Sequence, residues 1–443
     1  MLLEGWGRYP QLNSEVLTPA TPDQLNELVR GRAGLIARGN GRAYGDAAIG
    51  ARSSLSAVKL DRMRGFDPQT HVLTAEAGVL LSDILDTFVP RGFFVPVVPG
   101  TKYVTLGGMI ASDVHGKNHH RDGGFGAFLQ SLKLVLPNGE VWNCSPHENP
   151  DVFYATIGGM GLTGVIAEAS IKLKPIETAY IRQATTVAPD LASALKALDD
   201  ADEATYSVAW IDCLAGGALL GRSLIYAGEH ASRAEVEEAR VNGELLAKAK
   251  ASRLSVPLDL PSWTLNKASV KAFNEVYFRK GSRKGDAPAV VHYNPYFFPL
   301  DGVSQWNRIY GVRGFLQHQC VVPPNNAHAV LSEILERFAR SGRASFLAVL
   351  KKLGKANGLM SFPMPGYTLA LDVQVRDDIF ALLDEIDELV TRAGGRLYLA
   401  KDARQSPATF QAGYPGLAEF QEIRRRLGVE GKIASKLSER LGI

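Results

Sequence analysis

Residues 111–120, ASDVHGKNHH, concentrate side chains that could do chemistry: three histidines, a lysine, an asparagine and an aspartate. His115 and His119 are four residues apart, the spacing at which two imidazoles on one helical face can share a metal ion. Two histidines rarely suffice, and no carboxylate or cysteine lies at a convincing ligand spacing, so a metal site is disfavoured. The stretch is otherwise the polar wall of a cofactor pocket or a solvated turn, and the turn is what we expect for His119 and His120.

Three glycine-rich loops occur in the first 166 residues, and the second of them includes most of this stretch. Their sequences are ARGNGRAYGD (37–46), VPGTKYVTLGGMIASDVHGKN (98–118) and IGGMGLTGVI (157–166). Glycine lets successive backbone N–H groups turn towards a phosphate and approach it closely. One such loop is equally typical of a plain tight turn, and none matches the dinucleotide-binding or P-loop fingerprints. Together the three loops indicate a long phosphate-containing ligand that lies across the N-terminal part of the chain.

Short strands and turns must position these loops. The apolar alternation predicts, in order, a strand entering the first loop (34–46), a strand–helix–turn–strand unit (72–100), a hairpin that turns at 137–139 (131–144) and a strand that stops at Pro175 (161–175). Within the second unit, we expect Ser82 to cap the helix and Gly92 to form the turn.

The pattern changes after Pro175. Residues 330–338 and 379–389 repeat apolar side chains at helical spacing, and three further segments are typical of strands: 206–212, 314–322 and 367–375. A sheet covered by helices is therefore predicted. Gln317 and Gln319 alternate to one face of their strand, so both can hydrogen-bond a polyhydroxy ligand, although an exposed sheet face is equally compatible with them.

The stretch 261–285 combines basic and aromatic residues. Its basic residues are Lys267, Lys271, Arg279, Lys280, Arg283 and Lys284, and its aromatic residues are Trp263, Phe273, Tyr277 and Phe278. This composition suits a surface that meets anionic lipid headgroups and admits a lipid tail. An ordinary solvated segment is the alternative.

Composition narrows the class of protein. The chain has 443 residues, 46% hydrophobic and 21% charged, with a formal net charge of +3. These values are typical of a globular protein of two or three lobes, and the charge is too small to indicate a nucleic-acid partner. Three widely spaced cysteines suit a reducing compartment. Without an evident signal peptide or an apolar run of about 20 residues, we expect a cytoplasmic protein, either soluble or peripheral at the inner membrane face.

The ordered set GNGRAYGD, PGTKYVTLGGMIASDVHGKNHH and GGMGLTGVI resembles the FAD-binding domain of the vanillyl-alcohol oxidase / p-cresol methylhydroxylase superfamily. More closely, the chain resembles the decaprenylphosphoryl-β-D-ribose 2′-oxidase family within it. The similarity continues through YSVAWID, FRKG, FPLD, WNRIYG, GFLQHQ, SFPMPGY and LYLAKDAR, and so covers nearly the whole chain in order.

The resemblance implies an α+β fold of two lobes. Residues 1–176 and a C-terminal return, 395–443, would form the PCMH-type FAD-binding domain, and residues 177–394 an α+β substrate domain built on an antiparallel sheet. The implied reaction oxidises the 2-hydroxyl of a polyprenylphosphoryl-β-D-ribofuranose to a 2-keto sugar. A short-chain dehydrogenase/reductase partner would complete the epimerisation to arabinose for cell-envelope glycan synthesis. The alternatives are a soluble sugar-alcohol or aldonolactone oxidase that uses oxygen, and a flavin-bearing binding protein without turnover.

The resemblance also implies the site residues. Lys401, His115 and Tyr44 would be catalytic, with Lys401 acting either as a base or as a fixed cation. FAD would contact Arg38, Gly39, Asn40, Gly41, Arg42, Ala43, Gly100, Thr101, Thr105, Gly108, Ser112, His115, Asn118, Gly161, Thr163, Gly164, Ile166 and Tyr398. The substrate would contact Lys117, Trp210, Gln317, Gln319, Thr368, Ala370 and Lys401, and no metal is expected. Trp210 could equally belong to the core, and we expect Asp372 to orient a neighbour.

Two positions depart from the family pattern. Mycobacterial members carry a cysteine where this chain has Ala370, and a neighbouring family asparagine is Thr368 here. Both differences concern the substrate pocket. Many members of the wider superfamily attach FAD through a histidine in the first glycine loop, which has no histidine here, so we expect non-covalent FAD.

Overall fold

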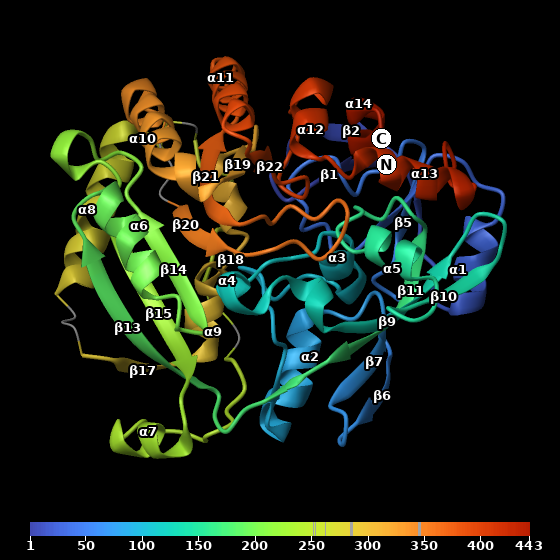
Figure 1. Cartoon of the computed structure of the whole chain (residues 1–443), viewed down its shortest axis with the longest axis horizontal. Helices are drawn as coiled ribbons and strands as arrows, with labels where there is room; N and C mark the ends of the chain where they lie inside the picture. The colour runs from blue at the N-terminus through green and yellow to red at the C-terminus, as the bar shows by residue number, and fades with distance from the viewer. Residues whose placement is uncertain (251, 253, 262, 284–286, 344–346) are drawn as a thin grey trace.

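A computed structural model describes residues 1–443 except 251, 253, 262, 284–286 and 344–346. The chain forms two lobes (Figure 1). The N-terminal elements lie to the right in that view, with the C-terminal helices beside them, and the middle of the chain lies to the left. Helices and mainly antiparallel sheets alternate in no regular order, which confirms the predicted α+β class. Domain boundaries at residues 176 and 394 stay a prediction.

The N-terminal lobe contains two main sheets. One is parallel and has the order β3-β5-β4, formed by Glu15–Leu17, Ser53–Ser56 and Leu35–Arg38. The other is antiparallel and has the order β10-β9-β11-β7-β6, formed by Val141–Cys144, Leu129–Val135, Val165–Lys172, Val72–Glu76 and Met63–Asp67. The predicted hairpin is confirmed, with Gly139 at φ 90° in the turn between β9 and β10.

Short helices and strand pairs complete this lobe. The helices are α1 (Pro22–Val29), α2 (Leu81–Phe88), α3 (Leu106–Ala111), α4 (His119–Asp122) and α5 (Pro150–Thr156). The remaining strands are β1 (Leu2–Glu4), β2 (Gln11–Asn13), β8 (Phe93–Phe94) and β12 (Lys174–Pro175). The last predicted strand ends at Lys172, and Pro175 belongs to β12, which pairs with β8.

The predicted capping of α2 by Ser82 is wrong. The N-cap residue is Leu80, and no side chain caps the helix. Its first amides instead find carbonyl groups of the neighbouring loop, since Leu81 N donates to Val104 O and Ser82 N to Lys102 O. Because that loop satisfies the amides which a cap would otherwise bind, no capping side chain is needed.

The C-terminal segment packs onto the N-terminal lobe. Its helices are α12 (Pro407–Gly413), α13 (Leu417–Arg426) and α14 (Lys436–Leu441). Phe410, Phe420 and Leu437 belong to the same buried cluster as the strands of the N-terminal lobe. The amides of Gly34 and Leu35 also donate to Gly431 O and Lys432 O. The two ends of the chain therefore build one core.

Among the described residues, the middle segment forms an eight-stranded antiparallel sheet of order β17-β13-β15-β14-β20-β21-β19-β22. In that order the strands are Ala289–His292, Tyr180–Ala188, Ser223–His230, Tyr206–Ile211, Ala348–Leu353, Gly366–Gln374, Phe315–Val322 and Arg396–Leu397. The accompanying helices are α6 (Leu191–Asp200), α7 (Arg233–Glu238), α8 (Lys267–Ser282), α9 (Tyr293–Phe297), α10 (Pro324–Ser341) and α11 (Ile379–Arg392). A short parallel pair joins β16 (Leu254–Ser255) to β18 (Val303–Ser304). The helices predicted from residues 330–338 and 379–389 are confirmed as α10 and α11.

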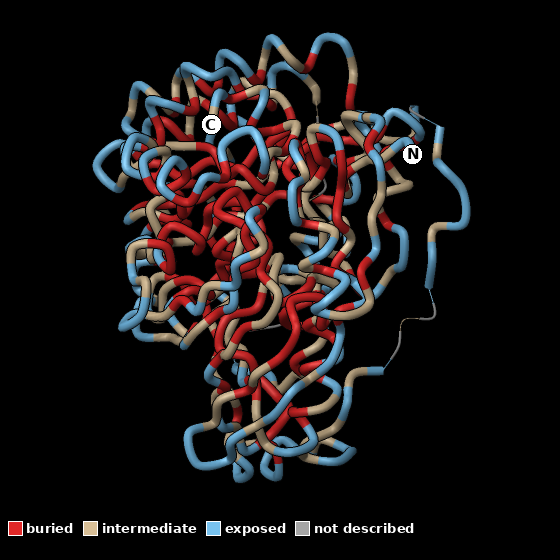
Figure 2. Tube along the Cα trace, turned by 90° about the vertical axis from the view of Figure 1, so that its right-hand side faces the viewer, coloured by how far each residue is buried: buried red, intermediate tan, exposed pale blue. Residues whose placement is uncertain are grey.

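The two faces of this sheet differ. Helices α6, α10 and α11 cover one face, where Leu369 and Leu371 of β21 are fully buried in the apolar core. The intervening residues Thr368, Ala370 and Asp372 point to the other face, because side chains alternate along a strand. Figure 2 shows buried positions throughout the interior of the molecule and exposed positions along its outer loops. In the described ranges, no helix has both the length and the apolar character needed to cross a bilayer.

Candidate active site

A cavity of about 600 Å³ lies where the glycine loops meet the open face of the large sheet. All three loops contribute to its wall, through residues 39–44, 98–117 and 160–166, and so does the C-terminal stretch 398–401. The opposite wall comes from alternate residues of the sheet, among them Trp210, Gln317, Gln319, Thr368 and Ala370. Segments distant in the sequence thus enclose one continuous space.

Close backbone packing explains the glycines at two positions. A Cβ atom at Gly39 would collide with Thr105 Oγ1, so the first and second loops approach each other only without a side chain there. Gly41 has a φ of +64°, in the left-handed region that L side chains rarely adopt. Thr105 also caps α3, accepting from Gly108 N at 3.2 Å. The loops therefore present their backbones to the cavity.

Most of the residues predicted to contact FAD line this cavity, but Arg38, Asn118 and Thr163 do not. Arg38 donates to the carbonyl groups of Glu4 and Ala48. Asn118 donates to Pro96 O, and the Thr163 hydroxyl is bonded to that of Thr156. These three side chains therefore stabilise the loops through contacts outside the cavity. Contacts of the other predicted residues with FAD stay a prediction.

The histidines of the opening stretch separate into two groups. His115 lines the cavity, with Nε2 3.0 Å from Gln319 Nε2 and its ring against Tyr398. His119 is buried away from the cavity, where Nδ1 accepts from Gly354 N at 2.9 Å. The expectation of a solvated turn is therefore wrong for His119, because a distant loop supplies a backbone donor to its ring. The described residues contain no group of three or more potential metal ligands.

Lys401 faces the first glycine loop. Its Nζ lies 3.6 Å from the centroid of the Tyr44 ring, and both residues line the cavity. Burial lowers the pKa of Lys401 to about 7, although the nearby Asp372 carboxylate opposes this shift. Burial raises the pKa of Tyr44, so its phenol stays a hydrogen-bond donor at neutral pH.

A chain of polar contacts connects Tyr44 to the sheet. The Gln317 amide lies 3.5 Å from the Tyr44 hydroxyl and donates to Asp372 Oδ1 at 2.5 Å. Asp372 thus orients Gln317, as expected from the sequence. On the same sheet face, Gln319 donates to the Thr368 hydroxyl at 3.2 Å. Both glutamines therefore present fixed amides to the cavity.

Two more lysines line the cavity. The Lys117 ammonium donates to the carbonyl of Tyr296, and burial lowers the pKa of this lysine to about 7. Lys351 lines the cavity from β20, and burial lowers its pKa to about 8. Burial, assisted by the charge of Lys351, also holds the pKa of His115 well below its usual value, so its imidazole is neutral at pH 7.

Sequence reasoning missed Lys351 and several other wall residues. The segment AVLKKL alternates, which places Lys351 on the same face as Val349, and this signal could have identified it. Other missed lining residues come from segments whose proximity the sequence does not reveal, including Trp6, Asp301 and Trp306. Trp210 lines the cavity, and its ring packs 4.7 Å from that of Tyr277.

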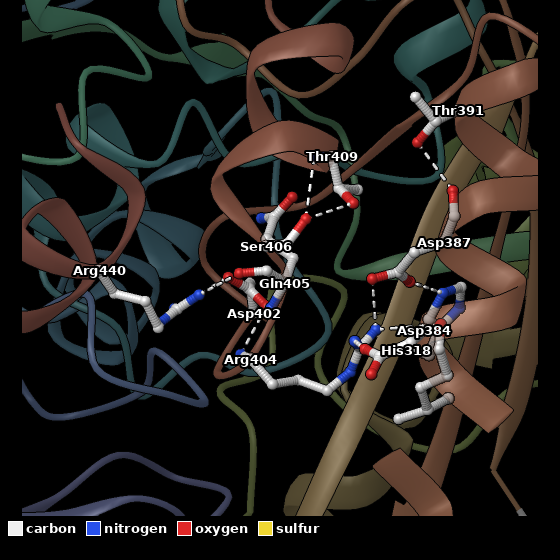
Figure 3. A network of polar contacts seen from close by, with 11 residues as sticks. His318, Asp384, Asp387, Thr391, Asp402, Arg404, Gln405, Ser406, Thr409 and Arg440 are labelled. Atoms are coloured by element: carbon white, nitrogen blue, oxygen red, sulfur yellow. Dashed lines mark hydrogen bonds and ion pairs between the residues drawn. The ribbon is translucent and has the colours of Figure 1, made fainter. Parts of the chain in front are cut away.

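A buried polar network holds the segment that carries Lys401 (Figure 3). The Asp402 carboxylate accepts from the amides of Arg404 and Gln405 and from Arg440. The Arg404 guanidinium donates to Asp387 Oδ2 of α11 at 2.6 Å, and Asp387 Oδ1 lies 3.0 Å from His318 Nε2. Since His318 lies between Gln317 and Gln319 on β19, the network ties Lys401 to the strand that carries both glutamines.

This chain is similar to known flavin-dependent proteins. Residues 14–145 match the FAD binding domain family model. Decaprenylphosphoryl-β-D-ribose oxidase of Mycolicibacterium smegmatis is 37% identical to this chain, over 99% of this chain and 97% of the relative. The chain belongs to the decaprenylphosphoryl-β-D-ribose oxidase family. An uncharacterized Streptomyces coelicolor protein is 33% identical over 82% of this chain and 100% of its own length. Mouse L-gulonolactone oxidase is 28% identical, but over only 36% of this chain and 37% of its own length.

The residues of this decaprenylphosphoryl-ribose oxidase family member fit FAD, its cofactor. The close contact of Gly39 with Thr105 leaves room for backbone approach only. Within the described residues, Arg42 Nε and His115 Nδ1 are buried and lack hydrogen-bond partners, and both side chains line the cavity. A polar ligand is needed to satisfy them. The protein is therefore an FAD-dependent oxidoreductase.

Proposed function

We propose that this enzyme oxidises the 2-hydroxyl of a polyprenylphosphoryl-β-D-ribofuranose to the 2-keto sugar. Similarity to the Mycolicibacterium smegmatis oxidase along nearly the whole of both chains supports the substrate class. The observation that carries the reaction is the convergence of Lys401, Tyr44, His115 and both glutamines on one cavity with the glycine loops. Positive charge on Lys351, whose pKa is about 8, suits a substrate with an anionic phosphoryl group.

In this proposal, different side chains of the cavity orient the sugar and accept its proton. Gln317 and Gln319, held by Asp372 and by Thr368, orient the hydroxyl groups of the sugar through hydrogen bonds. Lys401, neutral above pH of about 7, takes the proton of the 2-hydroxyl. When bound, FAD supplies the hydride acceptor for the oxidation. His115, neutral and bonded to Gln319, fixes the position of that amide.

The site also supports non-covalent attachment of FAD. Residues 37–46 contain no histidine or cysteine to which the flavin could be bonded. We further propose that a short-chain dehydrogenase/reductase reduces the keto product to the arabinose form for cell-envelope glycan synthesis. We propose as well that the enzyme, whose proposed substrate is lipid-linked, acts as a peripheral protein at the inner membrane face.

The alternative of a soluble sugar-alcohol or aldonolactone oxidase has weaker support. The lactone oxidase from mouse matches only 36% of this chain, whereas the Mycolicibacterium smegmatis enzyme matches 99% of it. The match to the lactone oxidase therefore leaves most of this chain without a counterpart in that enzyme.

Anaerobic mixing of the holoenzyme with a short-chain polyprenylphosphoryl ribose tests the proposal. We expect the flavin absorbance to bleach, and a 2-keto sugar phosphodiester to be recovered. The matched control is the 2-deoxy analogue, which has no hydroxyl to oxidise and should leave the absorbance unchanged. Bleaching by free alditols or aldonolactones, with none by the lipid-linked ribose, would support the alternative instead.

A further inference from the structure

Exposed apolar side chains are concentrated in one stretch of the chain. In the part of the chain that the structure describes, fourteen large hydrophobic residues are exposed, and six of them lie between residues 254 and 277. The most exposed of these are Trp263 (73%), Leu258 (71%) and Val276 (66%). Large apolar groups clustered in this way mark a surface that is covered in the functional state.

Helix α8 displays part of this cluster along one side. Phe273, Val276 and Lys280 are three or four residues apart, so they share a face, and Arg283 continues it at the end of the helix. All four are exposed, whereas Val270 and Asn274 are buried on the side that packs against the sheet lobe. The exposed face is thus apolar in the middle and basic towards its C-terminal end.

The same helix borders the candidate active site. Tyr277 lies between the exposed and buried sides of α8, is 37% exposed, and lines the cavity. Its ring packs 4.7 Å from Trp210, and its hydroxyl is 3.3 Å from that of Tyr226, two further wall residues. The exposed face of α8 is therefore continuous with the aromatic wall of the cavity.

The segment before α8 borders another part of the cavity wall. Leu254 and Ser255 pair with Val303 and Ser304, and Arg308 donates to Pro257 O at 2.7 Å. These contacts hold the exposed Leu258 beside residues 303–310, which include the wall residue Trp306. Exposed apolar groups consequently stand next to the cavity on two of its sides.

The charge of the region selects the kind of partner. Residues 254–283 contain five basic and two acidic side chains. Both acids are already paired: Glu275 accepts from Arg222 and Arg279, and Asp259 from Arg8. The remaining positive charge is complementary to anionic headgroups, and the apolar side chains can enter the layer beneath them. Lys284, at the end of the basic stretch, lies outside the described residues.

We propose that Leu254, Leu258, Trp263, Phe273 and Val276, with Lys271, Arg279, Lys280 and Arg283, form a docking surface for an anionic lipid bilayer. The inference rests on the proposed function, because a lipid-linked substrate must move between a bilayer and the cavity. Docking on this surface places the aromatic wall at Tyr277 and Trp210 against the membrane. The lipid tail then remains in the bilayer or passes along these rings, while the sugar reaches Lys401.

Vesicle flotation of the FAD-loaded full chain tests the docking surface. We expect binding to phosphatidylcholine vesicles that contain about one-third phosphatidylglycerol, weaker binding to phosphatidylcholine alone, and release by added salt. Val276→Glu should lower the partition coefficient at least about tenfold, and Lys280→Gln about fivefold, the effect of one basic side chain near an anionic surface. Val141→Glu is the matched control, because Val141 is 49% exposed on a strand of the other lobe. It should bind as the wild type does.

The outcomes separate docking from catalysis. Val276→Glu should reduce flavin normally with a short, water-soluble substrate and lose rate only with a long-chain substrate in vesicles. Equal flotation of the wild type and Val276→Glu, or binding that does not depend on anionic lipid, would overturn the docking surface. Capture of a second protein through these residues without vesicle binding would also overturn it. Failure of the short substrate to bleach the flavin would instead refute the proposed function, whatever the flotation shows.

Discussion

At the scale of single residues, Lys401 differs from an ordinary lysine in its protonation. An exposed lysine remains charged at neutral pH and is a poor base, whereas burial lowers the pKa of Lys401 to about 7. Lys401→Met keeps the length of the side chain and removes the amine. We expect this variant to retain FAD but to reduce it at least ~100-fold more slowly, the usual scale for one acid–base group. Stopped-flow absorbance measures the rate, and near-normal reduction would remove Lys401 from the mechanism.

The pH dependence of the wild type distinguishes a base from a fixed cation. If neutral Lys401 takes the proton, the rate of flavin reduction should rise as the pH increases through about 7, because the charged fraction falls. The opposite slope is expected if the ammonium form is needed. The measurement is the single-turnover rate at saturating substrate over a range of buffers. A rate that falls above neutral pH, with a slope that is lost in Lys401→Met, would assign Lys401 the role of a cation. The variant is needed because burial also brings the pKa of Lys117 and Asp372 to about 7 and that of Lys351 to about 8.

Ala370 offers a chemical probe of the cavity wall. It pairs with Gln319 and Val349 on the neighbouring strands and lines the cavity. The three native cysteines are buried, and burial raises the pKa of Cys320 to about 12. We expect native Ala370→Cys to take up a single maleimide and the wild type to take up none, as measured by intact-protein mass spectrometry. Labelling of the native wild type would contradict the burial of its three cysteines, and a label that peptide mapping assigns to Cys320 would contradict this arrangement of β19 and β21.

At the scale of elements, the network of Figure 3 fixes the loop that follows Lys401 to helix α11 and to Arg440. Arg404 is mostly buried and neutralises Asp387 of α11, whose side chain is 3% exposed. Removing the guanidinium leaves that carboxylate buried beside His318 alone. Arg404→Met should therefore lower the free energy of unfolding by about 3 kcal/mol, as measured by urea denaturation.

Arg392→Met is the control for that substitution. Arg392 belongs to the same helix, but it and its partner Glu388 are both about two-thirds exposed. Such a surface pair contributes at most about 1 kcal/mol. Equal destabilisation by the two variants would show that the buried network has no special importance for stability.

The elements also show how far sequence reasoning reaches. Helices α10 and α11 and the hairpin of β9 and β10 were predictable, because a regular period or a turn signal identifies them locally. The capping of α2 and the burial of His119 were not, since a distant loop supplies their hydrogen-bond partners. Most of the predicted site residues line one cavity, but their proximity to Trp6 and Lys351 depends on how the lobes pack.

At the scale of the whole molecule, the cavity wall combines the three glycine loops and the C-terminal stretch 398–401 with residues of the large sheet. Global unfolding must therefore destroy the FAD site, and bound FAD must stabilise the fold. Because residues 37–46 offer no histidine or cysteine for a covalent bond, heat or acid should release intact FAD into the supernatant. The melting temperature should rise with added FAD. Flavin fluorescence that stays with the denatured chain on a gel would contradict non-covalent binding.

Side chains alternate along β21, so its residues either pack in the core or line the cavity. Leu369, Leu371 and Val373 are locked in the core, whereas Thr368 and Ala370, the two positions that depart from the family pattern, both face the cavity. A change at either of them alters the shape offered to a substrate and leaves the packing beneath α10 untouched. A single substitution at one of these positions can thus change the substrate specificity without unfolding the protein. A library randomised at 349, 368 and 370, with Gln317 and Gln319 kept, should consist largely of folded enzymes that differ in the molecules they accept.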